Sequence, residues 1–179
     1  MYLLIMIIII GCSTKIPPWI QRSLIGKRRS GSEERIVGGF KALEPIPWQA
    51  HITMMVGGES FQCGGTILDE ETILSAAHCF RLGKQLGAIM VETGITANPV
   101  FERKFDINEE TSNVKEVIVH PKYQSVTKGD DIAIIKIKKP LTFNKNTKPA
   151  CLPEPTFSPD GELGVVSGWG RTSRCKTLV

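Results

Sequence analysis

The sequence lacks an apolar run long enough to cross a bilayer. Its longest run, Tyr2 to Ile10, falls well short of the roughly 20 residues that a transmembrane helix needs, so no stable membrane insertion is expected. The run is typical of a secretory signal peptide over residues 1–11, with small residues near the cleavage point, and predicts a secreted, extracellular protein. No Lys or Arg precedes the run. A misassigned start, an uncleaved anchor and bacterial lipoprotein processing at Ile9–Cys12 are therefore the alternatives.

The part of the chain that is expected to fold also lacks any excess of basic side chains. Residues 12–35 hold six basic and two acidic side chains, an excess that equals the formal net charge of +4. The remaining residues carry 16 of each sign. This balance argues against a nucleic-acid surface, so no nucleic-acid partner is expected. Residues 12–35 also contain Pro17, Pro18 and Gly26, which is typical of an exposed propeptide rather than a core.

From Ile36 onward the sequence has no sustained helical period, repeat or low-complexity tract. It has short β-type runs separated by turn residues, which predict an all-β Greek-key barrel in a single domain. The expected strands are 48–56, 65–68, 72–75, 88–92, 114–119 and 132–137. A helical turn is expected over Ala76–Phe80, and five prolines between Pro140 and Pro159 predict an irregular stretch.

Five short blocks then appear in a fixed order. They are Arg35-Ile36-Val37-Gly38-Gly39, Pro47-Trp48-Gln49, Cys63-Gly64-Gly65-Thr66, Ser75-Ala76-Ala77-His78-Cys79 and Asp131-Ile132-Ala133. Each block alone is weak, but together and in this order they resemble the trypsin-like serine endopeptidases. The resemblance covers Ile36 to about Thr172 and implies the first barrel of that fold, with 163–170 as the first strand of the second barrel. It defines residues 36–179 as a truncated protease domain.

The resemblance assigns His78 as the catalytic base and Asp131 as the carboxylate that orients it. Histidine suits proton transfer near neutral pH because its unperturbed pKa is about 6.5. Asp130 also offers a carboxylate, but relatives place the catalytic aspartate immediately before an apolar pair, which selects Asp131. The alternatives are a histidine packed beside a disulfide and a carboxylate that caps a strand. Ser75 resembles a group that helps to hold the carboxylate, whereas His51 and His120 lie outside the catalytic blocks.

Relatives are activated by cleavage at a bond that corresponds here to Arg35–Ile36. A trypsin-like protease would then free the Ile36 ammonium, which in relatives pairs with an aspartate beside the nucleophilic serine. That aspartate is not found here. The run Lys27-Arg28-Arg29 is either a second processing site or a solvated cluster of charges.

The five cysteines predict disulfides with one cysteine left over, because the signal peptide implies an oxidising compartment. Spacing alone leaves the pairing open. The resemblance implies Cys63–Cys79 and Cys12–Cys151, which leaves Cys175 without a partner. It implies no cofactor and no metal. Calcium-binding relatives place a glutamate soon after a glycine, whereas Gly94 is followed here by Ile95, so the acidic loop 102–110 is expected to be solvated.

The family's nucleophile motif, Gly-Asp-Ser-Gly-Gly, is absent, and neither Ser167 nor Ser173 has that setting. The expected function is that of a secreted serine endopeptidase zymogen acting on protein or peptide substrates, truncated and inactive as given. The alternatives are a non-catalytic homologue that binds substrates or protease inhibitors and a non-functional transcript product. Substrate specificity is not encoded, because the specificity pocket of relatives lies beyond residue 179.

Overall fold

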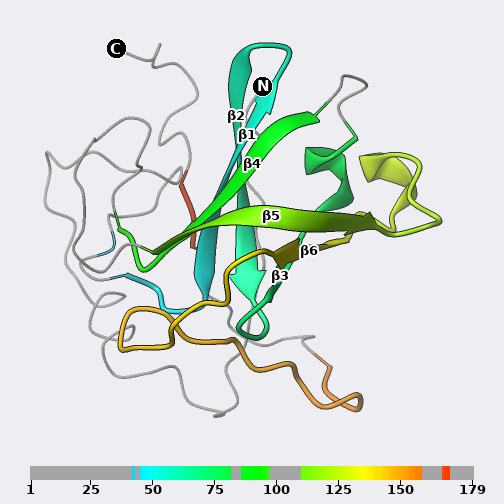
Figure 1. Cartoon of the computed structure of the whole chain (residues 1–179). Coiled ribbons are helices and arrows are strands. Elements are labelled where there is room, and N and C mark those ends of the chain that lie inside the picture. Colours follow the sequence, from blue (N-terminus) through cyan, green and yellow to red (C-terminus); the bar gives the residue numbers. More distant parts are fainter. Residues whose placement is uncertain (1–41, 43–44, 82–85, 97–109, 159–166, 170–179) are drawn as a thin grey trace, which may run out of the picture.

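The computed structural model describes residues 42, 45–81, 86–96, 110–158 and 167–169 (Figure 1). These residues form six strands: β1 (Gln49–Val56), β2 (Glu59–Ile67), β3 (Thr72–Ser75), β4 (Leu86–Thr93), β5 (Glu110–Val119) and β6 (Ala133–Ile137). Two short 3₁₀ turns, η1 (Ala77–Cys79) and η2 (Val126–Lys128), complete the regular structure of this part of the chain. No helix among the described residues is long and apolar enough to span a membrane.

The strands close into one barrel in the order β1-β2-β3-β6-β5-β4, and every neighbouring pair is antiparallel. The predicted all-β barrel is therefore confirmed. The predicted strand 65–68 is too short, because β2 already begins at Glu59. Gly57 and Gly58 both have positive φ, which allows a tight turn that brings Glu59 opposite Val56.

Alternation along the strands explains how the barrel buries its interior. In β1, Ala50, Ile52, Met54 and Val56 are buried, as expected when every second side chain points inward. Buried apolar residues from β2, β3, β4 and β6 complete the core: Ile67, Ile73, Val91, Ala133, Ile135 and Ile137. The inward face thus fixes the register of each strand, and with it the residues at the strand ends.

Gly65 is a glycine because β2 passes very close to its neighbours. A Cβ at this position would lie 2.6 Å from Cγ2 of Ile73 and 3.1 Å from the backbone oxygen of Leu74. The glycine therefore permits the close approach of β2 and β3 beside the segment that carries Cys63.

The residues after β6 are irregular, as the prolines predict, with one isolated bridge between Asn144 and Thr147. Most of the predicted strand 163–170 lies outside the described residues, and Ser167–Trp169 are not in a strand. Trp169 instead packs against the barrel. Its indole donates to the backbone oxygen of Thr96 at 3.2 Å, and its ring packs edge-on against His51 with centroids 5.1 Å apart.

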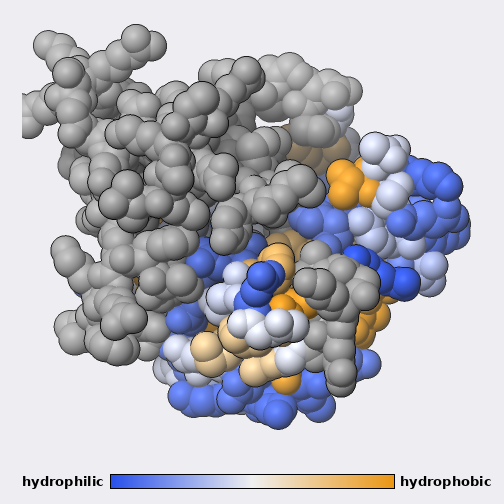
Figure 2. All heavy atoms as spheres, turned by 90° about the horizontal axis from the view of Figure 1, so that it is seen from above, coloured by the Kyte–Doolittle hydropathy of each residue, from blue (hydrophilic) through white to orange (hydrophobic). Residues whose placement is uncertain are grey.

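Several apolar side chains reach the surface of the described residues. Figure 2 shows apolar atoms exposed between hydrophilic ones on one face of the molecule. Leu152 is the most exposed of the large apolar side chains, at 68%, followed by Val126 and Ile118.

Candidate catalytic site

The position of His78 is fixed by a disulfide and a short turn. Cys63 of β2 is bonded to Cys79 at the end of η1, which confirms the predicted pairing. The turn is closed by backbone hydrogen bonds from Cys79 to Ala76 and from Phe80 to Ala77. Because Ala77 and Cys79 are both buried, the residue between them is held at the barrel surface with its ring beside the disulfide.

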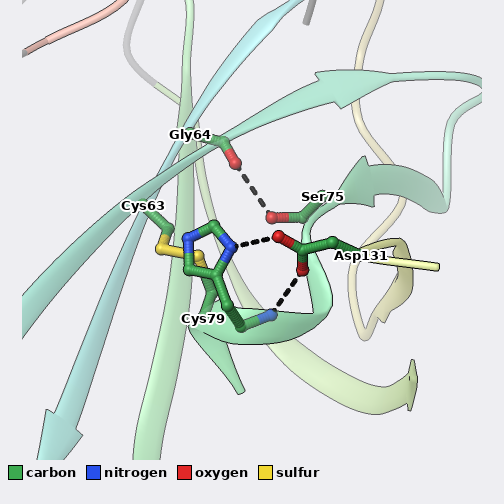
Figure 3. The surroundings of a disulfide bond; sticks show 6 residues. Cys63, Gly64, Ser75, Cys79 and Asp131 are labelled. Carbon is green, nitrogen blue, oxygen red and sulfur yellow. Dashed lines mark hydrogen bonds and ion pairs between the residues drawn. A yellow bond between two sulfur atoms is a disulfide. The ribbon is translucent and has the colours of Figure 1, made fainter. Parts of the chain in front are cut away.

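His78 and Asp131 lie in direct contact although 53 positions separate them in the sequence. Nδ1 of His78 lies 2.6 Å from Oδ2 of Asp131, and the backbone N–H of His78 donates to Oδ1 at 2.8 Å. Figure 3 shows both bonds beside the Cys63–Cys79 disulfide. The Asp131 carboxylate therefore binds both the ring and the backbone N–H of His78, which fixes the orientation of the imidazole.

The other ring nitrogen of His78, Nε2, has no such partner among the residues that the structure describes. Nε2 is buried and makes no hydrogen bond within the described part of the chain. Because the Nδ1–H group donates to the carboxylate, Nε2 carries the lone pair of the neutral ring. A ring nitrogen that is oriented in this way, with its lone pair not engaged in a hydrogen bond, can bind a proton or a metal ion.

Ser75 lies in the same corner but uses its hydroxyl differently from the expectation. The Ser75 hydroxyl donates to the backbone oxygen of Gly64 at 2.9 Å (Figure 3). It therefore ties the end of β3 to the β2 segment next to Cys63, and this bond supports the frame of the site.

Asp131 is presented by a turn with left-handed backbone. Gly129 and Asp130 have φ of 83° and 55°, and Asp130 is the one non-glycine residue with positive φ among the described residues. The backbone N–H of Ile132 donates to the backbone oxygen of Asp130 at 2.8 Å. The backbone N–H of His120 donates to the backbone oxygen of Ile132 at 3.0 Å. The Asp130 carboxylate lies 3.6 Å from His120, so the two adjacent aspartates point to different histidines.

The pKa of Tyr123 depends on the charge of this site. Its side chain is buried, and this burial together with the nearby Asp131 carboxylate raises the pKa of the Tyr123 hydroxyl, against an opposing effect of Arg81. Burial and a neighbouring negative charge both disfavour the phenolate.

A second histidine–carboxylate pair was missed by the sequence analysis. Nδ1 of His51 lies 2.8 Å from Oε2 of Glu92, and its Nε2 lies 3.3 Å from the side-chain oxygen of Gln62. The Thr53 hydroxyl also donates to Glu92, at 3.3 Å. His51 and Glu92 are register partners on β1 and β4. A histidine on one strand opposite a carboxylate on its neighbour could have predicted this pair. That prediction requires the pairing and register of the two strands, which the sequence alone does not give.

The remaining predicted site residues fall largely outside the described residues. This applies to the signal peptide 1–11, Cys12, the acidic loop 102–109 and the activation bond Arg35–Ile36. Cys151 is disulfide-bonded, and its predicted pairing with Cys12 stays a prediction. Ser167 accepts a hydrogen bond from the Gln49 side chain through its backbone oxygen at 3.2 Å. One group in the described residues has metal-ligand composition: Cys63, His78 and Cys79.

Comparisons with known proteins agree with the fold. A family model described as Trypsin matches residues 36–179. Among solved structures, a chain described as "Structure of GrC" is 24% identical and superposes with a TM-score of 0.54. The match covers 63% of this chain but only 46% of the solved chain, so this sequence spans about half the length of the relative that it matches.

Proposed function

The chain belongs to the trypsin family, and on this premise we propose that it is the N-terminal part of a secreted serine endopeptidase zymogen. The observation that carries the proposal is the His78–Asp131 pair, in which Nδ1 bonds to the carboxylate at 2.6 Å and Nε2 has no hydrogen-bond partner among the described residues. Secretion is supported by the signal-like run Tyr2–Ile10 and by the disulfides of Cys63, Cys79 and Cys151. The substrates are proteins or peptides.

In the proposed reaction His78 is the general base. Its Nε2 lone pair takes the proton of a serine hydroxyl as that oxygen attacks the peptide carbonyl, and the imidazolium then returns the proton to the leaving amine. Asp131 holds the ring in the required tautomer and stabilises the imidazolium, because both of its oxygens already bond to His78.

We propose that the protein is activated by cleavage between Arg35 and Ile36. The cleaving enzyme is a trypsin-like protease, since the bond follows an arginine in a charged segment. The predicted Cys12–Cys151 bridge would keep residues 12–35 attached after the cut. A reductant should then release this segment from the cleaved chain, whereas release without a reductant would contradict the bridge.

A polypeptide of these 179 residues alone is expected to hydrolyse no peptide, even after cleavage at Arg35. None of its serines stands in the family's Gly-Asp-Ser-Gly-Gly setting, so His78 has no positioned hydroxyl to activate. Loss of the nucleophile costs on the order of 10⁶ in kcat, and loss of even one oxyanion-hole donor costs about 10²–10³. Under this proposal, the nucleophile and the oxyanion donors are supplied by sequence outside these 179 residues.

The test is to sequence the complete transcript and to express the protein that it encodes. A downstream Gly-Asp-Ser-Gly-Gly should give turnover of fluorogenic peptides after activation, together with covalent labelling by a serine-directed phosphonate. Both should disappear in His78→Ala, whereas His120→Gln, a matched substitution of a histidine outside the pair, should retain them. A complete transcript without the serine motif, or turnover that survives His78→Ala, would contradict the proposal.

The same experiment separates the peptidase from the alternative, a non-catalytic homologue that binds substrates or protease inhibitors. That homologue would bind an inhibitor without cleaving it, and binding would persist in His78→Ala.

A further inference from the structure

We propose that the reduced form of this chain binds a zinc ion through Cys63, Cys79 and His78. The two sulfur atoms and a ring nitrogen of His78 lie within 4.8 Å of one another. In the oxidised chain the sulfurs are bonded to each other and offer no thiolate. The site is therefore formed only when the disulfide is opened.

The histidine already has the arrangement that metal sites require. A metal-binding histidine usually donates its second ring N–H to a carboxylate, which fixes the tautomer and strengthens the free nitrogen as a ligand. Nδ1 of His78 lies 2.6 Å from the Asp131 carboxylate, whereas Nε2 is buried and has no hydrogen-bond partner in the part of the chain that the structure describes. Nε2 is thus the ligand atom, and Asp131 positions it.

The donor set suits zinc better than calcium or magnesium. Two thiolates and one imidazole are soft and borderline ligands, which zinc binds at about 2.3 Å and 2.0–2.1 Å, respectively, and a fourth position can hold water. Tetrahedral donors at these lengths lie roughly 3.5 Å apart. The sulfurs must therefore separate while the ring approaches them by about an ångström. Cys79 ends the short turn η1 (Ala77–Cys79), which can adjust while Cys63 stays in β2.

An external reductant is needed to open the disulfide and form the zinc site. A water-soluble phosphine attacks one sulfur, the S–S bond breaks, and hydrolysis of the phosphonium gives the phosphine oxide and two thiols. Zinc then displaces both thiol protons and takes the Nε2 lone pair, so binding releases two protons and weakens as pH falls. The proposal needs neither a nucleophilic serine nor cleavage at Arg35, and it can therefore succeed or fail independently of the proposed function.

The test uses the full chain with Cys12, Cys151 and Cys175 replaced by serine, so that only the proposed thiols remain. The reduced and oxidised forms are titrated with zinc in a calorimeter and with cobalt(II) in an absorption spectrometer. We expect one metal ion per reduced chain, none per oxidised chain, and thiolate-to-cobalt absorption. Asp131→Asn should weaken zinc binding about 10–100-fold, and His78→Gln should remove the imidazole contribution to the cobalt spectrum. His120→Gln should change neither measurement, and the unsubstituted reduced chain should show the same cobalt spectrum.

Folding is followed at the same time by near-ultraviolet circular dichroism. If reduction unfolds the barrel, zinc must restore the folded signal at one equivalent for the proposal to stand. A folded, reduced chain without thiolate-to-cobalt absorption would overturn the proposal. Metal binding that is unaffected by His78→Gln would also overturn it, as would an unfolded, reduced chain that zinc does not refold.

Discussion

Among the described residues, the two shortest histidine–carboxylate contacts have nearly the same length but different surroundings. The His51–Glu92 contact measures 2.8 Å, and its side chains are 1% and 10% exposed. The His78–Asp131 contact measures 2.6 Å, with side chains 17% and 21% exposed. The first pair joins register partners on two strands, whereas the second joins a 3₁₀ turn to the loop before β6.

The second ring nitrogen separates the two pairs. In His51 it lies against the Gln62 side chain, and the Trp169 ring packs against the imidazole. In His78 it has no hydrogen-bond partner among the described residues. A histidine with both nitrogens engaged and its ring covered can only support structure, whereas an oriented ring with a free nitrogen can exchange a proton. The environment of Nε2 therefore indicates the role of each pair, and the bond to the carboxylate does not.

The largest expected difference between the pairs is in catalysis. In an expressed longer product that carries the serine motif, Asp131→Asn should lower kcat by about 10⁴, because an amide stabilises the wrong tautomer and no imidazolium. Glu92→Gln makes the same chemical change in the other pair and should leave kcat per active site unchanged. Rates are measured with fluorogenic peptides after active-site titration. Comparable losses in both variants would remove the distinction.

For stability, the His51–Glu92 pair is expected to matter more than the His78–Asp131 pair. His51→Ala should lower the free energy of unfolding by about 3 kcal/mol, because it leaves a buried carboxylate without its ring partner. His78→Ala removes a partly exposed pair and should cost about 1 kcal/mol. Urea denaturation followed by tryptophan fluorescence measures both variants. An equal loss would mean that burial does not separate the two pairs.

A smaller effect is expected at the turn that presents Asp131. Asp130→Ala should lower the free energy of unfolding by about 1 kcal/mol, because alanine tolerates the left-handed backbone poorly. Asp130→Asn keeps that tolerance and should cost much less. Neither His51 nor Glu92 depends on such a turn, since both lie in strands. Denaturation in urea tests this order, and a larger loss for asparagine would contradict it.

The smallest effect is a pKa change at Tyr123. Burial raises the Tyr123 pKa, and so does the Asp131 charge; Asp131→Asn should therefore lower this pKa because it removes that charge, whereas Glu92→Gln should not change it. In the parent chain the raised pKa stabilises the fold below the unfolded tyrosine pKa of about 10, and this stabilisation is lost as pH rises through the folded pKa. A chain that begins after residue 11 contains no other tyrosine, so absorbance at alkaline pH follows Tyr123 alone.

Local features of the sequence were sufficient to predict much of the barrel. Alternating apolar residues predicted β1 and β6 closely, since every second residue on such a strand faces the core. They did not predict the start of β2 at Glu59, which depends on the turn at Gly57 and Gly58. Ordered blocks around His78 and Asp131 selected these two residues through family resemblance, and the contact between them then appeared in the barrel.

The sequence by itself determined the strand pattern, the balanced charge of the folded part and the residues that flank His78, because these depend on neighbours along the chain. Tertiary structure decided that His51 faces Glu92 and that Asp130 turns toward His120. It also decided that Trp169 packs on the barrel and that Cys63, Cys79 and His78 share one corner. These contacts join residues that are distant in sequence. They are fixed only when the core sets the register of every strand, because a shift of one residue would turn each side chain to the opposite face.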